Sequence, residues 1–230
     1  FELGEAHNVN GQYNEALLEY KKAEYLDPDN PEVLSRIGKD LESKGKIEEA
    51  LEKYQSVVEI QKENLEVHYR CGKLYQRLNQ PEKAIQEFRT ISRLKPDWLE
   101  IRYELAKLFE QQGNFKEQIE EFEAIASVDA NSVEILMHLA NAYENSGDLN
   151  KALEFWHKCF QADPENPSFP EKVYELVLAG GSTEGIIDAL EALSILRSDD
   201  PELLLILARA YRDRGLMDEA NAYYGRVIEL

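Results

Sequence analysis

Residues 31–64 read PEVLSRIGKDLESKGKIEEALEKYQSVVEIQKEN, and this stretch contains one complete repeat of the chain. Asn30 and Pro31 are favoured residues at the start of a helix. The apolar residues that follow have helical spacing, and Gly45 suits the left-handed residue that ends a helix. A second apolar stripe begins just after this glycine. The stretch therefore predicts two antiparallel helices of about 12 to 14 residues joined by a short turn.

The same pattern returns every 34 residues without an insertion or deletion. Glycine marks one lattice position at Gly11, Gly45, Gly113, Gly147, Gly181 and Gly215. Asn79 fills the missing position, and asparagine is the next-best residue for left-handed backbone. Alanine marks a second position at Ala16, Ala50, Ala84, Ala152 and Ala220, and an aromatic residue marks a third at Tyr20, Tyr54, Phe88, Phe122, Trp156 and Tyr224. Such a period predicts a stacked array that binds along a surface and rarely carries chemistry.

Small residues are expected where the two helices of a hairpin approach most closely. Packed helices come within about 8–10 Å of each other, and the closest crossing tolerates little side chain. Gly38 and Ala50 hold these places in residues 31–64, and the aromatic residue of the second helix fills the gap beside them. No repeat buries both of its faces alone, so each requires its neighbours.

The positions together resemble the tetratricopeptide repeat. With residue 31 as slot 1, the pattern has a small residue at slot 8, aromatic residues at slots 11 and 24, Gly at slot 15, Ala at slot 20 and Pro at slot 32. Slot 11 holds Tyr75, Phe109, Tyr143 and Tyr211, and slot 32 holds Pro28, Pro96 and Pro164. The resemblance implies an all-α fold, a right-handed superhelical solenoid of helix-turn-helix repeats. First helices of such repeats line a concave groove, and second helices form the convex back.

The resemblance covers the whole chain, which is predicted to be a single array over residues 1–230. The repeats are expected at 1–30 (truncated), 31–64, 65–98, 99–132, 133–166, 167–200 (irregular) and 201–230 (truncated). The sixth repeat departs most from the pattern, because Tyr174 replaces a small residue, Leu190 replaces the aromatic one and Pro170 falls inside the expected first helix. We expect a local distortion there. Because both ends fall inside a repeat, we expect a fragment of a longer protein.

The charge balance excludes several classes of partner. The chain of 230 residues has 26 Lys and Arg against 45 Asp and Glu, a net charge of -19. This balance argues against binding to nucleic acid or to an anionic membrane surface. No apolar run reaches the ~18 residues that a membrane-spanning helix needs, so no direct membrane insertion is expected. Cys71 and Cys159 occupy apolar positions and are predicted to be buried and unpaired, which favours a reducing compartment such as the cytoplasm.

Residues that could carry catalysis form no recognisable pattern. The histidines are scattered, and none has metal-ligand spacing to Cys or carboxylates: His7, His68, His138 and His157. The chain also lacks a phosphate-binding glycine loop and a nucleophile elbow. We therefore expect no enzyme activity, no metal and no cofactor.

A cluster of basic residues marks the groove slots of the second to fourth repeats. The family geometry places slots 5, 6, 9, 12 and 13 in the groove, and in these repeats they hold six basic and three acidic residues. The predicted partner-binding residues are Arg36, Lys39, Tyr69, Arg70, Lys73, Arg77, Tyr103 and Lys107. A cationic groove with flat tyrosines suits an extended acidic peptide or a free C-terminus. The alternative is ordinary solvated surface, because an acidic row at slot 2 offsets the lysines: Glu32, Glu66, Glu100 and Glu134.

A second, apolar patch lies near the other end of the chain. Leu205 and Ile206 occupy groove slots of the last repeat, with Arg209 and Arg212 beside them. These residues could anchor a helix or peptide. They could also be buried by the irregular sixth repeat, and burial is the interpretation we favour.

The predicted function is a protein–protein interaction scaffold that binds a peptide or partner protein in its concave groove, with an acidic or carboxylate-bearing segment at repeats two to four. Two alternatives remain open. The first is a structural segment that self-assembles through its open ends. The second is the interaction arm of a larger multidomain protein whose catalytic part lies elsewhere. The sequence does not name the partner.

Overall fold

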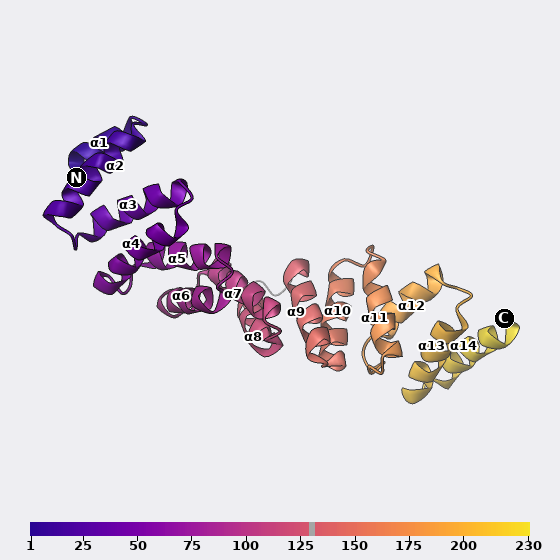
Figure 1. Ribbon diagram of the computed structural model, residues 1–230. Helices are drawn as coiled ribbons and strands as arrows, with labels where there is room; N and C mark the ends of the chain where they lie inside the picture. The colour runs from indigo at the N-terminus through magenta and orange to yellow at the C-terminus, as the bar shows by residue number, and fades with distance from the viewer. Residues whose placement is uncertain (129–131) are drawn as a thin grey trace. The chain divides into compact units, whose positions relative to one another are not determined.

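The computed structural model describes residues 1–128 and 132–230, and within these ranges the chain forms α-helices joined by short turns (Figure 1). No β-strand occurs in either range. The predicted all-α helical repeat fold is therefore confirmed. Residues 129–131 of the predicted repeat 99–132 lie outside the described residues.

The described residues divide into two compact units, Phe1–Leu108 and Phe109–Leu230. The N-terminal unit contains α1 (Glu2–Val9), α2 (Tyr13–Leu26), α3 (Pro31–Ser43), α4 (Ile47–Ile60), α5 (Leu65–Arg77), α6 (Pro81–Leu94) and most of α7 (Leu99–Gln111). The C-terminal unit contains α8 (Phe115–Ala126), α9 (Val133–Ser146), α10 (Leu149–Ala162), α11 (Ser168–Leu178), α12 (Ile187–Leu196), α13 (Pro201–Asp213) and α14 (Met217–Glu229). A single array over the whole chain stays a prediction.

The hairpin of α3 and α4 has the bounds that its residues predict. The Asn30 side chain accepts hydrogen bonds from two backbone N–H groups in the first turn of α3, at 3.1 and 3.2 Å. Pro31 is the first residue of that helix, where no N–H donor is needed. Gly45 has a φ of 75°, and α4 begins two residues later at Ile47. The capping side chain thus sets the start of the hairpin, and the left-handed glycine sets the turn between its helices.

The glycine at slot 8 is required by a close contact inside the hairpin. A Cβ atom at Gly38 would lie 2.6 Å from Cε1 of Tyr54, and one at Gly72 would lie 2.5 Å from Cε1 of Phe88. Both rings are fully buried. The aromatic side chain therefore fills the space beside the small residue, as the repeat pattern predicts. In the C-terminal unit Ala140 occupies the same slot and is also fully buried.

The turn of the sixth repeat differs from the lattice by one residue. Asn79 has the expected positive φ of 54°, but in the sixth repeat the positive φ of 105° belongs to Gly180 and not to the lattice residue Gly181. Helix α11 ends at Leu178, one lattice position earlier than α3, α5, α7 and α13, so the turn starts earlier. A side chain at Gly181 would instead meet Leu153, whose Cδ1 would lie 2.4 Å from the added Cβ.

The predicted distortion of the sixth repeat is confirmed. The two helices α11 and α12 have 11 and 10 residues, and α12 begins only at Ile187. Pro170 lies in the first turn of α11, where proline costs no helical hydrogen bond. The long turn between the helices contains a second left-handed glycine, Gly185, with a φ of 81°.

The two cysteines are unpaired and fully buried, as predicted. Burial raises the pKa of the Cys71 and Cys159 thiols to about 12, so both are un-ionised small apolar side chains at neutral pH. Within residues 1–128 and 132–230, none of the helices has the length and apolar character needed to cross a bilayer.

Candidate functional site

Two surfaces follow from the predicted binding residues, and each lies within one compact unit. We call the first the basic face, which consists of Arg36, Lys39, Tyr69, Arg70, Lys73, Arg77, Tyr103 and Lys107 on helices α3, α5 and α7. We call the second the C-terminal hollow, which lies between α11 and α13. The structure shows which of these side chains are already engaged inside the chain.

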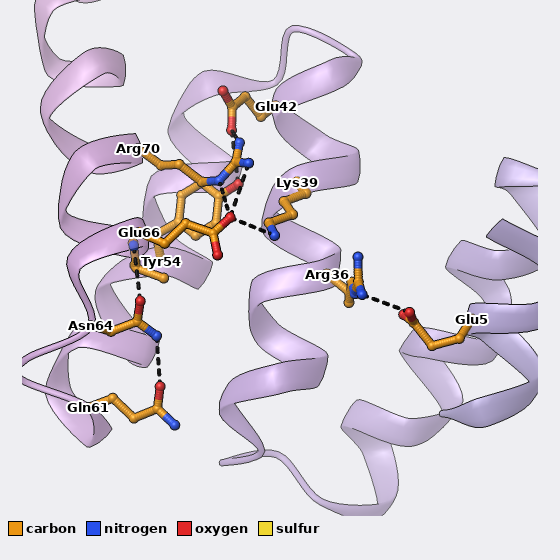
Figure 2. A network of polar contacts seen from close by, with 10 residues as sticks. Glu5, Arg36, Lys39, Glu42, Tyr54, Gln61, Asn64, Glu66 and Arg70 are labelled. Atoms are coloured by element: carbon orange, nitrogen blue, oxygen red, sulfur yellow. Dashed lines mark hydrogen bonds and ion pairs between the residues drawn. The ribbon is translucent and has the colours of Figure 1, made fainter. Parts of the chain in front are cut away.

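Cations of the basic face are paired with glutamates from neighbouring helices. The Nη2 atom of Arg36 lies 2.7 Å from Oε2 of Glu5 on α1. The Nζ atom of Lys39 lies 2.8 Å from Oε1 of Glu66 on α5. Figure 2 shows both pairs, with Glu66 directed toward Lys39. The hydrogen bond from Lys39 is the main reason that the pKa of Glu66 lies below its ordinary value.

Glu42 links α3, α4 and α5 through one carboxylate oxygen. Its Oε2 accepts hydrogen bonds from Tyr54 Oη at 2.9 Å and from Arg70 Nη1 at 3.0 Å (Figure 2). Arg70 also donates to Glu66 at 3.3 Å. Burial and the bond to Glu42 raise the pKa of Tyr54 far above its ordinary value, so this hydroxyl remains a donor. The guanidinium of Arg70 is therefore held on two sides before any ligand arrives.

Lys73 has a similar partner on α7. Oε1 of Glu104 lies 3.0 Å from its Nζ atom, and Oε2 of the same carboxylate accepts a hydrogen bond from Gln76 at 2.9 Å. Burial opposes ionisation of Glu104, but the bonds from Gln76 and Lys73 outweigh it and lower the pKa of this carboxyl. Glu104 thus neutralises Lys73 at neutral pH.

The two tyrosines of the basic face have covered rings. Tyr69 stacks on Trp98 with ring centroids 5.8 Å apart and an interplanar angle of 17°, and its hydroxyl donates to Glu100 at 3.1 Å. The Nζ atom of Lys107 lies 4.5 Å from the ring centroid of Tyr103. Such contacts stabilise the ring positions, and they leave less of each ring for a ligand.

Two cations of the basic face have no ion pair within the described ranges. Arg77 and Lys107 are both exposed, and neither forms an ion pair in residues 1–128 or 132–230, although Lys107 is near enough to Glu104 to help lower the pKa of that carboxyl. The whole surface is close to neutral, because α3, α5 and α7 together carry seven basic and seven acidic residues. The excess of basic groove slots is therefore offset by acidic residues beside them, several of which belong to the slot 2 row.

The C-terminal hollow has a volume of about 760 Å³ and an apolar centre. One face of α13 lines it with Pro201, Glu202, Leu205, Ile206, Arg209 and Asp213, opposite Val177, Leu178 and the turn Gly181, Ser182 and Thr183. The α13 residues follow the spacing of one helix face. The hollow therefore combines exposed apolar side chains with polar and charged ones.

The predicted burial of Leu205 and Ile206 is wrong. Both side chains are only half-buried, and Leu178 opposite them remains 47% exposed. The physical reason lies in the sixth repeat. Helix α11 ends early at Leu178, and the chain leaves it through Gly180 and Gly181, which have no side chains to cover the apolar centre.

The charges around the hollow differ in their pairing. Arg212 lies 2.8 Å from Asp213, whereas Arg209 and Glu202 form no ion pair within the described ranges. Sequence reasoning named Leu205, Ile206, Arg209 and Arg212, and the structure places the first three on the hollow. It missed Glu202 and the turn residues. Glu202 could have been found three residues before Leu205 on the same helix face, but nothing in the repeat pattern indicates the turn.

Comparisons with known proteins bear on the whole chain. Profiles described as TPR repeat match residues 4–41 and 38–79, and profiles described as tetratricopeptide repeat match residues 69–132, 133–166 and 202–230. The chain belongs to the tetratricopeptide repeat family. The matched segments leave residues 167–201 between them, which is where the tetratricopeptide pattern is weakest and where the hollow begins. Membership places the chain among protein–protein interaction scaffolds.

Solved tetratricopeptide structures have the same fold. MamA is 22% identical over 72% of this chain and 96% of its own, with a TM-score of 0.57. YrrB, a TPR protein with an unusual peptide-binding site, is 17% identical over 80% of this chain and 95% of its own, with a TM-score of 0.55. A structure of Naa15/Naa10 bound to HypK-THB gives 19% identity over 99% of this chain and 36% of that chain, with a TM-score of 0.68. A comparison with curated protein sequences gave no significant match.

Proposed function

We propose that this chain is an interaction scaffold that holds a segment of a partner protein in the C-terminal hollow. The observation that carries the proposal is the half-exposed apolar centre formed by Leu178, Leu205 and Ile206. Water in contact with such a centre is released when a ligand covers it, and this release favours binding. Two proteins of the same fold support the proposal, because YrrB has a peptide-binding site and the Naa15/Naa10 structure contains bound HypK-THB.

The test compares two changes that introduce equal charge at different apolar sites. The immobilised chain is incubated with native cell extract, and captured proteins are identified by mass spectrometry. The variant Leu205→Asp/Ile206→Asp places two charges in the hollow, and Ile195→Asp/Leu196→Asp places two on α12 at side chains that are 80% and 65% exposed and do not line the hollow. We expect the hollow variant to lose a partner that wild type and the α12 variant retain.

A further variant separates binding from folding. Leu178→Ser removes apolar surface from the opposite wall at a half-exposed position, where the effect on stability is small. Circular dichroism of each variant reports helix content. A folded hollow variant that captures the same partners as wild type would contradict the proposal.

A second candidate function rests on Arg77 and Lys107. These exposed cations have no ion pair within the described ranges and could bind an acidic peptide segment on the basic face. Arg77→Glu should then weaken capture of an acidic partner, and the loss should grow as the salt concentration falls. Partner capture that is unchanged by Arg77→Glu at low salt would exclude this candidate.

A further inference from the structure

The C-terminal hollow is lined by charges of opposite sign. Glu202 and Arg209 both line it, and they lie seven residues apart on α13, which corresponds to about 10 Å along a helix. Leu205 and Ile206 occupy the turn between them. Asp213 lines the hollow one turn beyond Arg209 and is paired with Arg212. Along one helix face the hollow therefore presents a carboxylate, apolar side chains, a guanidinium and then a carboxylate that already has a partner.

Neither Glu202 nor Arg209 has an ion-pair partner within residues 1–128 and 132–230, although their neighbours do. Arg197, the basic residue nearest to Glu202 in the sequence, lies 2.8 Å from Glu171 and 3.7 Å from Asp200. Arg212 lies 2.8 Å from Asp213, which leaves Asp213 engaged beside Arg209. The carboxylate of Glu202 and the guanidinium of Arg209 are therefore the charges of this surface that a ligand can pair.

We infer that the hollow selects an extended segment of a partner protein in which a basic, an aliphatic and an acidic residue alternate with residues that face away from the hollow. This inference rests on the proposed function and names the chemistry of its ligand. The basic side chain pairs with Glu202, the aliphatic side chain covers Leu205 and Ile206, and the acidic side chain pairs with Arg209. The charge pairs set the selectivity, and the apolar contact supplies most of the affinity.

The polar edge of the hollow favours an extended segment over a helix. Ser182 and Thr183 line this edge, and their hydroxyls can bond to backbone N–H and C=O groups of a ligand. These groups are free in an extended segment, whereas most of them are already paired inside a helix. Successive side chains of an extended chain point to opposite faces, so every second residue faces the hollow. Two such residues four positions apart span about 13 Å, a distance that the long side chains of Glu202 and Arg209 can reach from helix positions about 10 Å apart.

The test uses three synthetic probes with blocked ends. The first is acetyl-Gly-Lys-Ser-Leu-Ser-Glu-Gly-amide, the second replaces its Glu by Lys, and the third replaces its Lys by Glu. Each is titrated into the full chain with isotope-labelled Leu and Ile methyl groups at 150 mM salt. Methyl signals of Leu178, Leu205 and Ile206 report binding in the hollow. We expect the first probe to bind at least tenfold more tightly than either of the others.

Charge reversal on α13 provides the decisive variants. Arg209→Glu should invert the preference, so that the Lys-Ser-Leu-Ser-Lys probe becomes the tighter ligand. The matched control Arg214→Glu reverses an exposed charge directly after the same helix that does not line the hollow, and it should leave all three affinities within twofold of wild type. Thermal unfolding of each variant confirms that it folds.

Three outcomes overturn the inference. These are no methyl shift in the hollow at 5 mM of any probe, equal affinities of the three probes, and equal effects of Arg209→Glu and Arg214→Glu. The proposed function has a separate failure. If Leu205→Asp/Ile206→Asp abolishes capture of the native partner and Arg209→Glu does not alter it, the inference fails and the proposed function stands. If neither variant alters capture, the proposed function fails.

Discussion

The basic face and the C-terminal hollow differ in how slot 9 of one repeat and slot 2 of the next are occupied. Within the described ranges, Glu66 at slot 2 is paired on the basic face, whereas Glu202 at slot 2 has no ion pair at the hollow. On the basic face Lys39 at slot 9 meets Glu66 at slot 2 of the next repeat, at 2.8 Å. In the C-terminal unit slot 9 of the sixth repeat is Glu175, which pairs with Lys172 on its own helix, so Glu202 at slot 2 of the last repeat has no lysine beside it. Lys39 at slot 9 thus pairs with the glutamate at slot 2 of the next repeat. Where slot 9 holds Glu175 instead, the slot 2 carboxylate of Glu202 keeps its charge available to a ligand.

The largest expected difference between the two units concerns two histidines whose carboxylate partners differ in exposure. His68 is 4% exposed, with Nδ1 2.5 Å from Glu87 and Nε2 3.0 Å from the carbonyl of Lys62. His68→Leu leaves both acceptors unpaired and should lower the free energy of unfolding by about 2 kcal/mol at pH 5.5. The control His157→Leu removes a half-buried imidazole from Asp188, which is exposed and stays hydrated, and it should cost less than about 0.5 kcal/mol. Urea denaturation measures both.

The His68 effect should depend on pH. The hydrogen bond that His68 donates to Glu87 is the main cause that raises the pKa of His68, against the opposing effect of burial. Because the folded pKa lies above that of the unfolded chain, the stabilisation is fully present below about pH 6.5 and is lost as the pH rises through the folded pKa. Wild type should thus lose stability between pH 5.5 and 8.5 by an amount that His68→Leu does not show. Equal pH profiles would refute this assignment.

Removal of a glutamate from the basic face should lower the stability of the fold. Removal of the arginine that lines the hollow should change the stability very little. Glu42→Ala takes the acceptor from Tyr54 and Arg70 and should lower the free energy of unfolding by about 1.5 kcal/mol. Arg209→Ala removes a charge without an ion pair in the described ranges and should change it by less than about 0.5 kcal/mol. Equal costs in chemical denaturation would show that the two surfaces do not differ as described.

The paired glutamates should also suppress binding to the basic face. The double variant Glu66→Gln/Glu104→Gln releases Lys39 and Lys73 from their ion pairs. At low salt it should bind a hexaglutamate peptide about tenfold more tightly than wild type, as measured by fluorescence anisotropy. The variant Glu117→Gln/Glu120→Gln on α8 is a control of equal charge change. A similar gain in that control would attribute the effect to net charge alone.

Much of the fold could be predicted from the sequence, because its determinants are local and repeat at fixed spacing. Gly38 packs against Tyr54, and Asn79 has a left-handed backbone conformation. Both features depend only on residues of the same hairpin. The pairing of the basic face could be predicted only in part. The acidic row at slot 2 was visible, but the repeat period does not tell which carboxylate reaches which cation.

The hollow was the least predictable feature. The shift of the left-handed residue from Gly181 to Gly180 and the early end of α11 depend on packing inside an irregular repeat, including the approach of Leu153 to Gly181. Leu205 and Ile206 were identified as an apolar patch, but their exposure depends on that turn. The repeat pattern therefore identified apolar residues that line the hollow, but it did not predict that a hollow would form beside them.

The smallest expected effect concerns a slot at which a buried polar residue replaces alanine. Gln118 on α8 is 1% exposed, and its Oε1 has no hydrogen-bond partner within the described ranges. Gln118→Ala restores the residue usual at this slot and should raise the free energy of unfolding by about 1 kcal/mol. The same measurement on Ala152→Gln, at the equivalent slot of α10, should show a loss. A destabilised Gln118→Ala would indicate that this amide is needed in the core.

The central claim is that partners bind at the hollow and that the paired part of the basic face is not a binding site. The most direct measurement is photo-cross-linking in native extract, with a benzophenone amino acid placed either at Ser182 on the edge of the hollow or at Ser43 on α3. We predict a discrete cross-linked partner from position 182 that disappears in the Leu205→Asp/Ile206→Asp background, and none from position 43. A partner captured from position 43 and not from position 182 would contradict the account.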